Sequence, residues 1–156
     1  MKLWTLPDSE KTAKRVNWFL TTYLTRLSLL AGEKLIDISS PSFNSLPSGS
    51  SENSVEQKMQ RGLEAMEALK AIKEAMLCTM GHYPDLLIKF YFEHEPVWQI
   101  RQELFIDHNS FRKHKAIALN QFADAWETIQ EKYNFEDKID LHVYSQSDND
   151  SELKEE

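Results

Sequence analysis

Cysteine, glycine and proline are scarce in this chain of 156 residues, which contains one, four and five of them. The single cysteine, Cys78, cannot form a disulfide within the chain, and its neighbours Met76, Leu77 and Met80 predict a small, buried apolar side chain. Low cysteine usage fits a reducing compartment, so we expect a cytoplasmic protein.

Long hydrophobic runs are also missing. No window approaches the roughly 18 to 20 apolar residues that a membrane-spanning helix needs. The longest apolar stretch near the start, residues 16–30, is interrupted by polar side chains such as Asn17 and Arg26 and has no small-residue cleavage site. We therefore expect neither a membrane partner nor a signal peptide.

Patterns that carry chemistry of their own are absent as well. His94, His108 and His114 do not have the spacing of a tight pair of zinc ligands on one helix. Cys78 and His82 could share a helix face, but no third group is available to orient them, and the chain has no glycine-rich phosphate loop. The sequence therefore predicts no enzyme activity, no catalytic residue, no metal site and no cofactor.

Basic residues are outnumbered, 18 against 25 acidic ones, which gives a formal net charge of −7. Residues 136–156 supply −6 of this total, whereas the first thirty residues are net positive. Contact with nucleic acid depends on a local patch rather than on the average charge. The acidic balance nevertheless limits non-specific affinity, because few phosphates can be neutralised.

Helical periodicity is what the sequence contains most clearly, and it predicts an all-α fold. In the N-terminal region 1–38, Asp8 or Ser9 can cap a basic amphipathic helix. The apolar residues of this helix recur every three to four positions up to about Ala31, and Gly32 favours its end.

A linker and a second long helix are expected next. Segment 39–53 is rich in Ser, Pro and Asn and cannot bury a core. Region 54–83 predicts an amphipathic helix that runs from about Ser54 to Met80. The predicted apolar stripe comprises Val55, Met59, Leu63, Met66, Leu69, Ile72, Met76 and Met80.

Region 84–132 predicts three further helices around a short break at residues 105–107. The expected spans are 84–92, 96–104 with Val97, Ile100 and Leu104 buried, and 108–132 with Asp107 as its N-cap. Region 133–156 predicts a mostly disordered acidic tail, in which the weak alternation from Ile139 to Tyr144 leaves a short strand open.

The break between the last two helices is typical of a helix-turn-helix reader of double-stranded DNA. The reading helix of such a motif presents short polar and basic side chains near its N-terminus, because that end enters the major groove. An alternative stays open, in which the same residues are ordinary surface side chains of a helical hairpin. The predicted DNA-binding residues are Gln99, Arg101, His108, Asn109, Ser110, Arg112, Lys113 and Lys115.

Residues 87–122 resemble region 4 of bacterial sigma factors. In that region a Tyr ends one helix, an Ile follows nine residues later, and a break leads into the polar start of the reading helix. The positions that carry the resemblance here are Tyr91, Ile100, the segment 107–113 and the pair Ala118-Leu119.

Over residues 16–126 the chain resembles the ArpU family of phage transcriptional regulators. That family has a basic N-terminal helix, a loop with a Ser-Pro pair, a long helix and a sigma-like helix-turn-helix. The matching positions are Ser40-Pro41, Leu46-Pro47, Phe111, Lys115, Ala118, Leu119, Phe122 and Ala123. The resemblance implies sequence-specific control of phage late or lysis genes in a Gram-positive bacterial host, together with the host RNA polymerase.

Two positions depart from the family pattern, which has Ala in place of Arg101 and Gly in place of Phe105. A bulky residue is strained in a left-handed turn, so we expect Phe105 to give a different turn or a tilted reading helix. A rival interpretation is a helical adaptor or DNA-mimicking interaction protein that binds no DNA. In either case the two long amphipathic helices could pair within one chain or across a homodimer.

Overall fold

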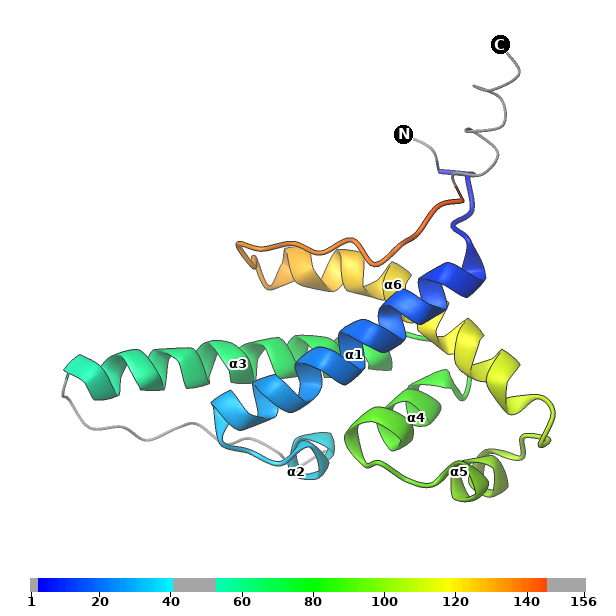
Figure 1. Cartoon of the computed structure of the whole chain (residues 1–156), viewed down its shortest axis with the longest axis horizontal. Helices are drawn as coiled ribbons and strands as arrows, with labels where there is room; N and C mark the ends of the chain where they lie inside the picture. The colour runs from blue at the N-terminus through cyan, green and yellow to red at the C-terminus, as the bar shows by residue number, and fades with distance from the viewer. Residues whose placement is uncertain (1–2, 41–52, 146–156) are drawn as a thin grey trace, which may run out of the picture.

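The computed structural model describes residues 3–40 and 53–145, and every regular element in these residues is helical (Figure 1). The predicted all-α fold is therefore confirmed. Most of the expected linker 39–53 lies outside the described residues. The elements are α1 (Ser9–Ala31), α2 (Leu35–Ser39), α3 (Asn53–Leu77), α4 (Tyr83–Leu87), a π-helical turn η1 (Ile88–Phe92), α5 (Val97–Leu104) and α6 (Phe111–Lys132).

The core lies where α1 packs against both α3 and α6 (Figure 1). Helix α1 buries a stripe that includes Phe19 and Leu20 at 4% and 0% exposure. Its bounds agree with the expectation, because Asp8 caps the start by accepting a hydrogen bond from the Lys11 N–H at 2.9 Å. At its end Gly32 adopts a left-handed conformation with φ of 72°.

Helix α3 is buried over only part of the predicted stripe. Met66, Leu69, Ile72 and Met76 lie in the core, but Val55 is 36% exposed because the first turns of α3 extend past the end of α1 (Figure 1). The expected burial of Met80 is wrong as well: α3 ends at Leu77, and the Met80 side chain is 73% exposed.

The burial predicted for Cys78 is wrong, since this side chain is exposed. Cys78 directly follows the last residue of α3, so it leaves the apolar face of the helix. The next residue, Thr79, is the one that is buried, and its hydroxyl donates a hydrogen bond to the Met76 carbonyl at 2.6 Å.

The helix expected over 84–92 is one turn of α-helix followed by the π-helical turn η1. The wider turn brings two consecutive aromatic side chains into the core, Tyr91 at 3% and Phe92 at 0% exposure. The Tyr91 hydroxyl donates to Asn17 Oδ1 of α1 at 2.6 Å. In α5, Ile100 is buried as predicted, whereas Val97 is 39% exposed, so its predicted burial is wrong.

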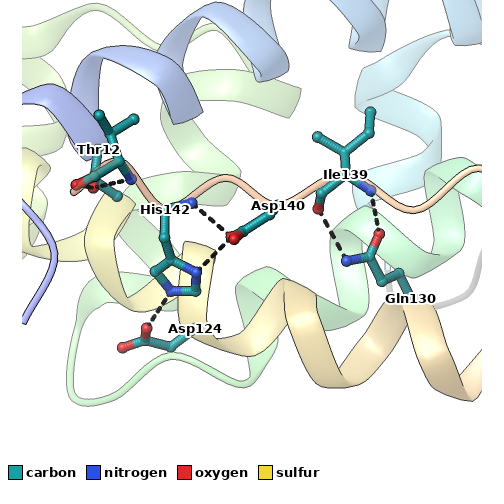
Figure 2. A network of polar contacts seen from close by, with 7 residues as sticks. Thr12, Asp124, Gln130, Ile139, Asp140 and His142 are labelled. Carbon is teal, nitrogen blue, oxygen red and sulfur yellow. Dashed lines mark hydrogen bonds and ion pairs between the residues drawn. The ribbon is translucent and has the colours of Figure 1, made fainter. Parts of the chain in front are cut away.

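Residues 135–145, which we call the C-terminal strap, are packed against the helices rather than disordered. Figure 2 shows the Gln130 side chain exchanging two hydrogen bonds of 2.9 Å with the backbone of Ile139. Thr12 and Val143 are also joined, since the Val143 N–H donates to the Thr12 hydroxyl at 3.0 Å. Most of the expected disordered tail, residues 146–156, lies outside the described residues, and the short strand left open over 139–144 does not form.

A histidine latch holds the strap to α6 (Figure 2). His142 Nε2 lies 2.7 Å from Asp124 of α6, and Nδ1 lies 2.8 Å from Asp140 of the strap. Burial alone would lower the pKa of His142, but the hydrogen bonds and charges of the two carboxylates outweigh burial and raise it above its ordinary value of 6.5. The charge of Arg15 on α1 also acts on Asp140.

We predict that the stabilisation contributed by the histidine latch falls as pH rises. Because the folded-state pKa is raised, protonated His142 stabilises the fold fully below about pH 6.5, and this contribution is lost as pH rises through the raised value. His142→Gln should therefore cost about 1 to 2 kcal/mol at pH 6 and less at pH 9. Urea unfolding at both pH values tests this, with exposed His108→Gln as the control, and a difference that is independent of pH would contradict it.

Candidate nucleic-acid interface

The turn between α5 and α6 is a tight left-handed cap. Phe105 has φ of 57° and ψ of 47°, and its N–H donates to the Arg101 carbonyl. The Ile106 N–H donates to the same carbonyl at 2.9 Å, and the Ile106 side chain is buried. The expectation of a different turn is therefore wrong, because Phe105 keeps the left-handed conformation that favours glycine, and the tilt of the reading helix stays a prediction.

Helix α6 begins at Phe111, three residues later than predicted. Ser110 rather than Asp107 occupies the N-cap position, and no side chain makes a capping hydrogen bond there. Asp107 acts through its backbone instead, since its carbonyl accepts from the Ser110 N–H at 3.0 Å. His108 and Asn109 consequently lie in an exposed turn before the helix rather than in its first turn.

Three of the predicted side chains lie on α6, in its first two turns. Arg112 and Lys113 are exposed, so both are free to meet a ligand. Lys115 is half-buried, and its ammonium lies 3.9 Å from the ring centroid of Phe90, so its stem and charge both help to hold α6 on η1. Burial lowers the pKa of Lys115.

Of the two predicted residues on α5, Gln99 is engaged within the protein. Gln99 Nε2 donates to Glu95 at 3.1 Å and to Glu103 at 2.9 Å, and Lys89 bridges the same two carboxylates. These negative charges make Gln99 unsuited to a phosphate contact. Arg101 is half-buried, and its Nε is buried without a hydrogen-bond partner among the described residues.

A basic residue of α1, missed by the sequence reasoning, joins the start of α6. Lys14 lines a shallow groove of about 460 Å³ together with Arg112 and Lys115, and Glu10 lies at the same groove. The positive charge of the first thirty residues was the available signal. Sequence alone gave no reason to place that charge beside α6, because the crossing of α1 and α6 is a tertiary contact.

Comparisons of this chain with protein-family models, with curated proteins and with solved structures find no match. Over the described ranges 3–40 and 53–145, no helix is both long and apolar enough to cross a membrane. The same part of the chain contains no group of three or more His, Cys, Asp or Glu side chains placed to hold a metal ion.

The left-handed turn predicts a stabilising substitution. Phe105→Gly should relieve the backbone strain while losing no packing, because the Phe105 side chain is 94% exposed. After allowing for the greater freedom of glycine in the unfolded chain, the free energy of unfolding should rise by about 0.5 to 1 kcal/mol. Urea denaturation measures this. Phe105→Ala is the matched control, since it removes the ring but keeps the strain, and equal stability of the two variants would count against strain.

Proposed function

We propose that this chain is a double-stranded DNA-binding transcription regulator of ArpU type, which inserts the start of α6 into the major groove. The observation that carries the proposal is the exposure of Asn109, Arg112 and Lys113 at one end of a long helix, directly after a tight turn. A helix presented by its N-terminal end is the element that helix-turn-helix proteins use to read bases.

The chemistry of these side chains assigns their roles. Arg112 can donate two hydrogen bonds to guanine, and Asn109 can exchange two with adenine. Lys113, and Lys14 of α1, which lines the same groove as Arg112, would contact backbone phosphates in this pose. Gln99 has no part in the proposed interface, because Glu95 and Glu103 already hold its amide.

The ArpU resemblance extends the proposal to further partners. It implies that the regulator acts on phage late or lysis genes beside the host RNA polymerase, inside the bacterial cytoplasm. A homodimer is a further proposed state, because paired recognition helices would double the contacts with an operator.

A second candidate function is a helical adaptor that binds another protein and no DNA. Two exposed aromatic side chains favour it, since Trp98 on α5 is 64% exposed and Phe105, which directly follows α5, is 94% exposed. Aromatic side chains are enriched at protein interfaces. The net charge of −7 also suits a partner other than DNA.

A fluorescence-anisotropy titration separates these functions. The probe is a labelled random-sequence 30-base-pair duplex, measured at 50 and 150 mM NaCl. Substituting both Arg112 and Lys113 by Ala should raise Kd about tenfold or more at the lower salt. It should also reduce the slope of log K against log salt by about 1, because Lys113 is the phosphate contact of the pair whereas Arg112 reads a base.

The matched control removes the same charges elsewhere. Lys58 and Arg61 are both exposed on α3, so substituting this pair by Ala makes an equal change of net charge. The control should keep at least half of the duplex affinity. If both pairs of substitutions weakened duplex binding equally, the effect would come from net charge and not from a specific interface. No duplex binding by any version at 50 mM NaCl would overturn the regulator and leave the adaptor.

A further inference from the structure

A pocket of about 530 Å³ lies between α1, α3, the end of α6 and the start of the C-terminal strap. This volume falls within the range of small-molecule sites, roughly 300 to 1,000 Å³. The pocket shares no lining residue with the groove beside Arg112, so the two surfaces are separate.

Five aromatic side chains form a continuous wall of this pocket. Each ring contacts the next, with centroid separations of 5.3 to 6.2 Å, and they come from α1, α6 and the start of the strap. Tyr23, Tyr133 and Phe135 are partly exposed, so these three rings are the ones that a ligand can contact, whereas Phe19 and Trp126 are buried. In order of contact the rings are Tyr23, Phe19, Trp126, Phe135 and Tyr133.

The rim of the pocket is acidic. Glu64 and Glu67 of α3 stand on one side, Glu136 and Asp137 on the other, and all four side chains are exposed. No ion pair between described residues involves any of them. Burial and the carboxylate of Glu74 raise the pKa of Tyr133 to about 12, and the charge of Glu67 adds to this. Among the described residues, the lining of the pocket contains four carboxylates and no basic side chain.

The ring of Trp126 lines the pocket although this residue is only 5% exposed. Its Nε1 is itself buried and has no hydrogen-bond partner among the described residues, so it offers no accessible donor to an occupant. The acidic rim and the aromatic wall are therefore the features that select an occupant, and both favour a positive charge.

We propose that the pocket binds a small organic cation of the quaternary ammonium class. A quaternary ammonium is weakly hydrated, so the aromatic wall can replace its water and attract its charge through the ring faces. The four carboxylates draw the cation in without having to bond it directly. An anionic group on the ligand would be repelled by the same rim, which disfavours phosphocholine and betaine.

Choline is the probe, and its uncharged carbon isostere 3,3-dimethylbutan-1-ol is the matched control ligand. Both are titrated into the full chain while the indole N–H signal of Trp126 is followed by NMR, with KCl added to equal ionic strength. Choline should bind saturably and about tenfold tighter than the isostere, because only the charge differs. Equal binding of the two ligands, or a response to KCl alone, would overturn the proposal.

Two pairs of variants test the rim. The substitutions Glu67→Gln and Asp137→Asn together should weaken choline about fivefold and leave the isostere unchanged. The control pair, Glu56→Gln and Asp85→Asn, removes two exposed charges outside the pocket and should change Kd less than twofold. If both pairs lost the same choline affinity, the effect would come from net charge alone, and this result would falsify the site.

The wall is tested separately by Phe135→Leu, which keeps apolar packing and removes one π face. It should weaken choline several-fold more than the isostere, whereas equal weakening of the two would indicate a purely hydrophobic cleft. This site does not depend on the proposed DNA binding. The variant without Arg112 and Lys113 should therefore bind choline as the wild type does, even where it binds no duplex.

Discussion

The fold depends on the burial of α1 between α3 and α6. Phe19 of α1 lies 5.5 Å from the ring of Trp126, which stacks on Phe122 one turn earlier in α6 at 5.9 Å and 11°. Rings of this size contribute several kcal/mol each when removed from water, and their shape fixes the crossing of the helices. This crossing brings Lys14 beside Arg112 at one end and sets the aromatic wall at the other, so both candidate surfaces rest on it.

Structural features that depend only on neighbouring residues, such as helix ends, could be predicted from the sequence. Features that depend on how other helices pack against an element could not. Asp8 and Gly32 mark both ends of α1, because capping needs only neighbouring residues. The amphipathic pattern of α3 is equally local, but it cannot tell where a covering helix stops. Val55 and Met80 fit the stripe and are still exposed, since α1 does not reach the first and the helix ends before the second.

The candidate interface likewise combines features that the sequence could predict with features that it could not. The exposure of Arg112 and Lys113 could be predicted from the apolar period of α6, which assigns them to its outer face. The start of this helix could not, because Asp107 is a good capping residue by type but its backbone closes a separate turn. Phe105 is the opposite case. Propensity argued against a left-handed conformation, and the packing of Ile106 just after it holds the turn in place.

The pairing of Thr12 with Val143 joins positions that are 131 residues apart. The Asp8 N–H also donates to the Val143 carbonyl at 2.7 Å, so the start of α1 and the strap satisfy each other's hydrogen-bonding groups. During synthesis at the ribosome, the first helix emerges long before the segment that closes over it. Most of the apolar surface can be buried earlier by α3 and α6, but this closure must wait until Val143 has left the exit tunnel. A prematurely terminated product would therefore leave the beginning of α1 unpaired and open to proteases.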